Sequence, residues 1–516
     1  MTEIHWHKLQ NGSDIRGVAI PGVPDEPVNL TPEIAQRIAL GFAHWLSEQR
    51  GQPLGELAIA VGRDSRLSGP ELMASMMAGL ASLGVRVYDL GIASTPAMFM
   101  TTVTPAFTDP QGDLNPCDGG IMLTASHLPF NRNGCKFFTA QGGLEKQNIR
   151  AILDLAAANA FQTAATPGTI TPQDFMTTYA GQLVAMIRAG ANHPEDYDHP
   201  LKGLNIVVDA GNGAGGFYVS QVLEPLGADT TGSQFLEPDG MFPNHVPNPE
   251  NAAAMAAIVD AVLTQGADFG IIFDTDVDRG AAVDATGQEL NRNRLIALIA
   301  AITLREHPGS TVVTDSITSD GLTQFIEEEL KGVHHRFKRG YKNVINEAIR
   351  LNATGQDSWL AIETSGHGAM RENYFLDDGA YLVSKLLVEL ARAKGEGRSL
   401  TDLIASLKEP VESQEFRLQI KTPEFQAYGQ QVIEALTTFA ANQENWAIAP
   451  QNYEGVRVAC SGEQGWFLLR LSLHDPVMPL NIEANTPSGV ATIGRRLLTF
   501  LEAYADLDLT PLETLE

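Results

Sequence analysis

The chain has 516 residues, 44% of them hydrophobic and 19% charged, so it can bury several cores and a disordered chain is not expected. Its formal net charge of −27 repels phosphate backbones and anionic headgroups, so we expect no nucleic acid and no membrane surface as a partner. The three cysteines have no CxxC spacing, and the apolar run 295–304 is well short of the ~20 residues that span a bilayer. Residues 1–10 show no signal-peptide pattern. Together these features predict a cytoplasmic protein.

Three stretches repeat one local plan: an apolar strand, a polar turn, an amphipathic helix and a second strand. They cover residues 57–88, 205–228 and 311–337. In the second stretch the helix is expected to end at Leu226 and a strand to begin at Ala228. Strand–helix–strand units are typical of largely parallel sheets covered by helices, so the sequence predicts three α/β domains in series.

The last hundred residues change character, because strand-like runs there follow one another with short links. Strands are expected at 415–420, 455–460, 466–473 and 480–483, and helices at 425–439 and 488–504. Strands that are neighbours in sequence pair antiparallel, which predicts a smaller α+β domain at the C-terminal end.

Composition also suggests where the domains join. Candidate linkers are 164–172, 284–293 and 408–410. We therefore expect four domains, at residues 1–165 (serine loop), 166–288 (metal-binding loop), 289–408 (sugar-recognition loop) and 409–516 (phosphate-binding loop).

Three aspartates at alternate positions, Asp274, Asp276 and Asp278, directly follow the strand-like run 269–273. Alternation places their carboxylates on one side of the loop, where mutual repulsion calls for a cation and oxygen ligands favour Mg²⁺. An EF-hand loop would need glycine at Arg279 and glutamate at position 285, and a helix before it. A solvated acidic turn remains the other interpretation.

A second loop, 124–136, carries Ser126 with His127 and Lys136 close by in sequence. Its proline and glycine indicate turns, so we expect Ser126 on an exposed loop, without the G-x-S-x-G elbow of an esterase. A plain turn serine is the alternative. The nearby turn 63–66, Arg-Asp-Ser-Arg, is either a salt-bridged turn before a helix or a support for the serine loop.

Together with Glu363-Thr-Ser-Gly-His367 and Gly12-Ser-Asp-Ile-Arg-Gly17, these two loops resemble, in order and across the whole chain, the α-D-phosphohexomutase superfamily. The resemblance implies three repeated α/β domains with mixed, largely parallel sheets plus a C-terminal α+β domain, heart-shaped around a central cleft.

The resemblance also implies roles for particular residues. Ser126 would be the phosphoserine and would ligate Mg²⁺ together with Asp274, Asp276 and Asp278. The remaining implied site residues are, for catalysis, Arg16, His127, Lys136, Arg279 and Lys342, and, for substrate binding, Glu363, Ser365, His367, Arg470 and Ser472.

The phosphate-binding run departs from the family pattern Arg-x-Ser-(Gly/Asn)-Thr-Glu-Pro. Arg470 and Ser472 remain, but His474 and Asp475 replace Thr and Glu, and Pro479 stands where a second arginine is usual. A lone arginine binds phosphate less well than a pair. The turn 485–489 could compensate, with Thr486 as cap and the amides of the final helix facing an anion, or it could be plain helix capping. Leu128, in place of the usual Asn, removes one polar contact from the serine loop.

We therefore expect an enzyme, a phosphohexomutase that interconverts hexose 1-phosphate and hexose 6-phosphate of mannose or glucose through a phosphoserine and a 1,6-bisphosphate. A phosphoglucosamine mutase is the nearest alternative, and the altered clamp leaves open a non-catalytic sugar-phosphate binding or regulatory protein. The expected cofactors are Mg²⁺ and hexose 1,6-bisphosphate, the partner is a small sugar phosphate, and the assembly is a monomer or homodimer.

Overall fold

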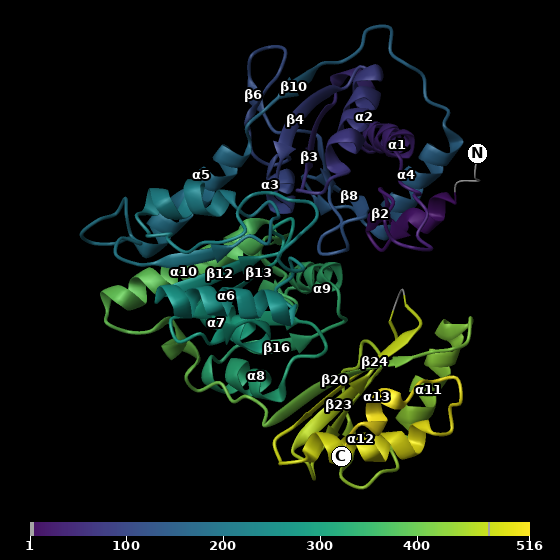
Figure 1. Ribbon diagram of the computed structural model, residues 1–516, viewed down its shortest axis with the longest axis vertical. Helices are drawn as coiled ribbons and strands as arrows, with labels where there is room; N and C mark the ends of the chain where they lie inside the picture. Colours follow the sequence, from purple (N-terminus) through teal and green to yellow (C-terminus); the bar gives the residue numbers. More distant parts are fainter. Residues whose placement is uncertain (1–4, 473–474, 516) are drawn as a thin grey trace. The chain divides into compact units, whose positions relative to one another are not determined.

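The computed structural model describes residues 5–472 and 475–515, so the expected clamp position His474 lies outside the described residues. The chain divides into two compact units, one formed by residues 1–291 with 365–402 and the other by residues 292–364 with 403–516. Each unit is described by itself below, with elements labelled as in Figure 1.

The first unit begins with an eight-stranded mixed sheet in the order β1-β2-β8-β7-β3-β4-β10, with β9 paired to β8. β3 pairs in parallel with β4 and β7, whereas β8 pairs antiparallel with β7 and β2. The strands are β1 Gln10–Asn11, β2 Asp14–Val18, β3 Ala58–Arg63, β4 Arg86–Ile92, β7 Gly119–Leu123, β8 Arg132–Thr139, β9 Gly142–Gly143 and β10 Ile170–Pro172.

Helices pack against both faces of this sheet, and β3, which alternates larger and smaller side chains, shows how. Ile59 and Val61 of β3 share one core with α1 Pro32–Arg50, α2 Gly69–Ser82 and α4 Lys146–Ala158, which lie together in Figure 1. On the opposite face, a Cβ added at Gly62 would come within 2.7 Å of Met98 in α3 Thr95–Met100. The missing side chain therefore lets α3 approach the sheet.

The second sheet of this unit has the order β11-β12-β13-β14, with a parallel β11–β12 pair and antiparallel pairs elsewhere. Val207 and Ile272 of this sheet pack against α6. The elements are β11 Ile206–Asp209, β12 Phe269–Phe273, β13 Gly280–Asp284, β14 Glu289–Leu290, α5 Met176–Ala191, α6 Ala252–Gln265, α10 Gly379–Gly395 and the small pairs β5 Phe107–Thr108 with β6 Leu114–Asn115 and β18 Gly368–Met370 with β19 Leu376–Asp377.

Of two expectations for this region, one is confirmed and one was wrong. The helical run does end at Leu226, as a π-helix, Val219–Leu223, followed by a 3-10 turn, Glu224–Leu226, where Pro225 lacks the N–H that a continuing α-helix needs. The residues after Gly227 form isolated bridges, at Asp229 and Gln234, instead of a strand.

The second unit contains three parallel strands in the order β16-β15-β17 and, separately, a five-stranded antiparallel sheet β20-β24-β23-β22-β21. Its strands are β15 Thr311–Thr314, β16 Val333–Arg336, β17 Ser358–Ile362, β20 Glu412–Gln419, β21 Trp446–Ile448, β22 Val456–Cys460, β23 Gly465–Leu469 and β24 Val477–Ala484. Its helices are α7 Arg292–Glu306, α8 Asp320–Gln324, α9 Tyr341–Ala353, α11 Phe425–Ala440, α12 Gly489–Leu501 and α13 Thr510–Glu513.

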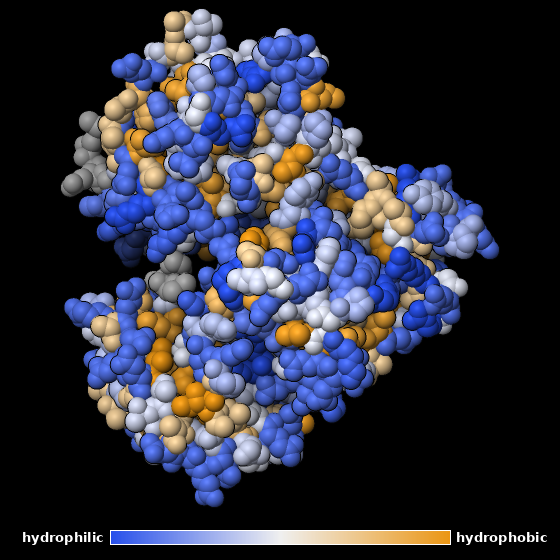
Figure 2. All heavy atoms as spheres, turned by 180° about the vertical axis from the view of Figure 1, so that it is seen from behind, coloured by the Kyte–Doolittle hydropathy of each residue, from blue (hydrophilic) through white to orange (hydrophobic). Residues whose placement is uncertain are grey.

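These sheets confirm the expected fold class of α/β domains with mixed sheets and a C-terminal α+β domain. Part of the expected linker 164–172 is an edge strand, since β10 pairs in parallel with β4. The expected linker 284–293 likewise contains β14 and the first residues of α7. Within residues 5–472 and 475–515, no helix is long and apolar enough to cross a membrane. Figure 2 shows one face of the molecule, on which apolar residues form separate patches among polar ones.

Candidate active site

The three aspartates lie in the turn between β12 and β13 of the first unit, at the carboxyl end of a buried strand. Asp274, Asp276 and Asp278 are at most 1% exposed, and one oxygen of each lies within 4.8 Å of the others. Val277, between them, has φ 67°, which is strained for a β-branched residue. Its N–H donates to the Asp274 carbonyl, and its own carbonyl accepts from Gly379 at 3.1 Å, so the turn is held from both sides.

The cluster has the properties of a cation site. Burial and the charges of Asp278 and Asp276 raise the pKa of Asp274 well above its usual range. Burial acts in the same direction on Asp278, but Lys136, His367 and Arg279 outweigh it and hold the pKa of that carboxyl low. The Oδ1 atom of Asp276 is buried without a hydrogen-bond partner in the described part of the chain. These convergent carboxylates fit a hard divalent ion such as Mg²⁺.

Ser126 lies beside this cluster. Its Oγ donates to Asp274 Oδ2 at 3.1 Å and accepts from Arg279 Nη2 at 2.9 Å. Its backbone has φ 49°, and its N–H donates to Thr124 Oγ1. The serine loop is exposed at His127 and Pro129, as expected, but Ser126 itself is only 8% exposed.

One buried guanidinium holds the serine loop in place. Arg66 is fully buried and donates to the backbone carbonyls of Ser126 and Leu128 and, at 2.8 and 2.9 Å, to those of Pro129 and Arg132. Asp64 lies 3.3 Å from its Nε. Of the two interpretations of the turn 63–66, these contacts favour the supporting one.

The cationic side chains expected near the serine contact the aspartate cluster or the serine loop. Lys136 Nζ donates to Asp278 Oδ2 at 2.5 Å and lies 3.9 Å from Asp276. The Arg279 guanidinium contacts Asp274, Ser126 and His127 Nδ1. Arg16, on β2, donates to the Thr124 carbonyl and pairs with Asp14 at 2.8 Å.

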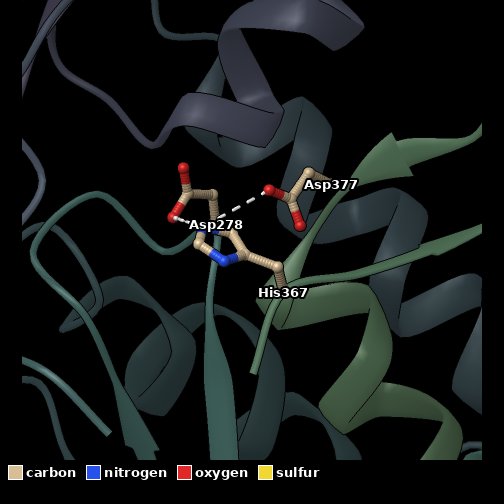
Figure 3. Close-up of side chains that lie close together, drawn as sticks. All are labelled: Asp278, His367 and Asp377. Atoms are coloured by element: carbon tan, nitrogen blue, oxygen red, sulfur yellow. Dashed lines mark ion pairs between the residues drawn. The ribbon is translucent and has the colours of Figure 1, made fainter. Parts of the chain in front are cut away.

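The second half of the expected sugar loop belongs to the same unit. The backbone of His367 forms an isolated antiparallel bridge with Arg279. In the side chain, Nδ1 lies 2.9 Å from Ser365 Oγ, and Nε2 lies 3.5 Å from Asp278 Oδ1 and 3.6 Å from Asp377 Oδ2 (Figure 3). Burial lowers the pKa of His367 despite the raising effect of Asp278.

The first half of that loop belongs to the second unit. Glu363 Oε1 accepts the N–H of Gly340 at 2.6 Å, and Thr364 Oγ1 donates to Asp315 at 2.6 Å. Lys342 lies in the first turn of α9, two residues after Gly340. The described structure therefore ties Glu363 to the segment that leads into α9.

The expected phosphate clamp is also in the second unit. Arg470 follows β23, and its Nε is buried without a hydrogen-bond partner in residues 5–472 and 475–515. Ser472 Oγ accepts the N–H of Asp475. Pro479 lies within β24, where its carbonyl accepts the N–H of Arg470.

The suggested compensation by the final helix was wrong. α12 begins at Gly489 with Ser488 as its N-cap, instead of Thr486. The amides of Ser488 and Val490 donate to the two oxygens of Glu412, at 2.6 and 3.0 Å. A carboxylate of the chain itself therefore uses the donors that an anion would need.

Sequence reasoning missed two residues at the site. Thr95 donates its hydroxyl to Asp276 Oδ2 from α3, and Asp377 approaches His367 from β19. Thr95 has no local signal, because it is 181 residues from Asp276. Asp377 lies on a strand of two residues, which is too short for a recognisable pattern.

Comparisons with known proteins agree with this geometry. Profiles described as phosphoglucomutase/phosphomannomutase alpha/beta/alpha domains I, II and III match residues 7–163, 188–287 and 291–410. A phosphoglucomutase of Neisseria gonorrhoeae is 30% identical over 496 residues, 96% of either chain. A phosphomannomutase/phosphoglucomutase of Pseudomonas putida is 32% identical over 456 residues, 87% of this chain and 89% of the other.

Solved structures show the same likeness. A crystal structure of a phosphoglucomutase/phosphomannomutase family protein from Burkholderia thailandensis matches with a TM-score of 0.77 at 27% identity, over 95% of this chain and 96% of that one. By both sequence and fold, this chain belongs to the phosphoglucomutase/phosphomannomutase family of the α-D-phosphohexomutase superfamily.

Proposed function

We propose that this phosphohexomutase moves a phosphoryl group between O1 and O6 of a mannose or glucose phosphate, with Ser126 as the phosphoryl carrier. One observation carries the proposal: the Ser126 hydroxyl lies 3.1 Å from a carboxylate of the three-aspartate cluster and 2.9 Å from Arg279. A nucleophile beside a cation site and a guanidinium suits phosphoryl transfer, which needs positioning and charge neutralisation more than covalent chemistry.

In the proposed reaction, the P–O bond to phospho-Ser126 breaks and a new P–O bond forms to the free sugar hydroxyl, whose proton passes to a basic side chain. The hexose 1,6-bisphosphate then reverses its orientation in the site and transfers its other phosphoryl group to Ser126, whose P–O bond forms as the P–O bond to the sugar breaks. Mg²⁺, held by Asp274, Asp276 and Asp278, would supply positive charge beside the phosphoryl oxygens.

The chain's own residues take the remaining roles in this proposal. Arg279 orients the Ser126 oxygen and neutralises phosphoryl charge, since its guanidinium contacts that oxygen. Lys136 faces Asp278 and balances the aspartate cluster, while Arg16 holds the loop through the Thr124 carbonyl.

The sugar-recognition loop and the phosphate clamp are proposed to bind the substrate without taking part in the transfer itself. Glu363 accepts hydrogen bonds from sugar hydroxyls, with Ser365 and His367 from the same loop, and Arg470 with Ser472 binds the phosphate that does not react. Lys342 is proposed to assist proton transfer. A reducing compartment such as the cytoplasm suits the three buried thiols, and the working assembly is proposed to be a monomer or homodimer.

The Ser126→Ala variant tests the proposal. We expect it to lose turnover of mannose 1-phosphate and glucose 1-phosphate in a coupled assay, and we expect wild-type protein incubated with hexose 1,6-bisphosphate to gain ~80 Da in intact-mass spectrometry. Wild-type activity in Ser126→Ala would reject Ser126 as the carrier. Absence of the adduct together with absence of turnover would favour a sugar-phosphate binding protein.

The preferred sugar is decided by a separate measurement. Discrimination is a ratio of kcat/KM values, so the same enzyme preparation should be compared on mannose, glucose and glucosamine 1-phosphates. A higher kcat/KM on the amino sugar would assign phosphoglucosamine mutase activity instead.

A further inference from the structure

The Nε2 atom of the His367 imidazole faces two carboxylates, those of Asp278 and Asp377 (Figure 3). Its Nε2 atom is 3.5 Å from one and 3.6 Å from the other, both longer than a normal hydrogen bond. A small movement of the ring toward either acid would complete a hydrogen bond to that acid and lengthen the contact with the other.

The two carboxylates differ in what else they must do. Asp278 already accepts a hydrogen bond from Lys136 Nζ at 2.5 Å, and it is one of the three acids of the aspartate cluster. Asp377 is outside that cluster, on β19, where its backbone pairs with Ala369 of β18. At 7% exposure it presents its carboxylate from a fixed, buried strand.

The other ring nitrogen limits the imidazole further. Nδ1 lies 2.9 Å from Ser365 Oγ, so a hydroxyl that donates to Nδ1 leaves the proton on Nε2, facing the two acids. That N–H and a cation in the aspartate cluster would both draw on the Asp278 carboxylate, whose Oδ1 faces Nε2.

We propose that Asp377 is a positioning residue: it accepts the Nε2–H of His367 and so keeps the imidazole oriented while Asp278 serves the cation. The inference rests on the proposed function, since it presumes that the aspartate cluster binds Mg²⁺. It predicts that removing the acceptor at position 377 sends the His367 N–H back to Asp278 and weakens cation binding.

A double-mutant cycle on the full chain tests this. Asp377→Ala and Asp377→Asn both remove the negative charge, but only Asn keeps an acceptor of the same shape, so the difference between them reports hydrogen bonding. Both are made in the wild-type and in the His367→Ala background. The readout is the Mg²⁺ dissociation constant by titration calorimetry, without sugar, so turnover is not needed.

With His367 present, we expect Asp377→Ala to bind Mg²⁺ roughly 10-fold more weakly than Asp377→Asn, the effect typical of residues that orient metal-site partners. In His367→Ala the two should bind Mg²⁺ equally. If Asp377→Ala does not fold, Asp377→Leu, which fills the volume of Asn without an acceptor, takes its place.

Equal affinities of the Ala and Asn variants with His367 present, or a gap that persists in His367→Ala, would overturn the inference. Wild-type protein is measured in the same series. If wild type binds Mg²⁺ and turns substrate over but the double-mutant cycle shows no coupling between positions 367 and 377, only the role of Asp377 is rejected. Wild type that neither binds Mg²⁺ nor turns over defeats the proposed function itself.

Discussion

At the scale of single residues, the candidate site contains two backbone conformations that L-residues rarely adopt, at Ser126 and Val277. Such conformations persist only where the surroundings hold them, and each costs on the order of 1–3 kcal/mol. At Val277, the carbonyl of Asp274 and the amide of Gly379 provide that support. At Ser126, the support comes from the four carbonyl contacts of Arg66.

Arg66→Lys tests how far catalysis depends on that support. An ammonium has no planar fork and cannot reach all four carbonyls, so the serine loop should shift without any loss of a substrate contact. We expect kcat to fall by about 100-fold, the cost of a displacement of about 1 Å in a reacting group, with KM little changed. Steady-state kinetics on glucose 1-phosphate measures both values.

The neighbouring Arg63→Lys is the matched control, because the Arg63 guanidinium donates to the Asp64 carbonyl and not to the serine loop. It should keep kcat close to wild type. Equal losses in the two variants, or a rise in KM alone for Arg66→Lys, would contradict a positioning role for Arg66.

At the scale of elements, the strands that carry the site could be predicted from sequence because they are fully buried apolar runs. The run 269–273 is β12, and the segment around 120–123 is β7. The edge strand β10 could not be predicted, because Ile170–Pro172 is exposed and has no apolar pattern. Its pairing with β4 depends on a neighbour far away in sequence.

The candidate site divides in the same way. The serine and the three aspartates could be found from local motifs, since each group is contiguous in sequence. The partners that hold them, such as Thr95 and Asp377, could not, because single polar residues on short elements have no periodic or motif signal. The end of the helical run at Leu226 could be predicted from Gly227, but its change from a π-helix to a 3-10 turn at Glu224 could not.

A buried ion pair at the end of β11 predicts how stability depends on pH. His245 has a 3% exposed side chain and lies 2.9 Å from Asp209 Oδ2. Burial by itself would lower the pKa of His245, but the hydrogen bond and the charge of Asp209 outweigh it and raise that pKa. The folded state therefore binds the proton more tightly than the unfolded state does.

This stabilisation is fully present below the unfolded histidine pKa of about 6.5 and is lost as pH rises through the higher folded value. The urea midpoint of wild type should therefore exceed that of His245→Gln most clearly near pH 6, and the gap should narrow toward pH 8.5. Hydrogen bonds to charged groups contribute roughly 1.5–3 kcal/mol, which bounds the gap.

His199→Gln is the control for this pH effect, because His199 also faces an aspartate, Asp196 at 3.0 Å, but with a 50% exposed side chain. Solvent screens such a pair, so its substitution should barely change the midpoint at any pH. If the difference in urea midpoint between wild type and His245→Gln grew with pH, His245 would not be the protonated partner of Asp209.

At the scale of the whole molecule, the chain returns to its first unit after residue 364, so that the expected sugar loop contributes residues to both compact units. Glu363 belongs to the second unit, whereas Ser365 and His367 belong to the first. The acids of the proposed cation site, by contrast, all lie in the first unit. A ligand that binds one unit should stabilise that unit selectively.

Calorimetric unfolding in EDTA and in Mg²⁺ tests this selectivity. We expect two transitions, and we expect Mg²⁺ to raise the midpoint temperature of only the one that belongs to the first unit. An ion that binds only the folded state, at 100 times its dissociation constant, stabilises that state by about 2.7 kcal/mol. Asp276→Asn removes one acid of the cluster and should abolish the shift, while Asp268→Asn, just before β12 begins, should keep it. A single transition that Mg²⁺ moves as a whole would mean that the two units unfold cooperatively, and an unchanged trace for wild type would mean that the three buried carboxylates do not bind this ion.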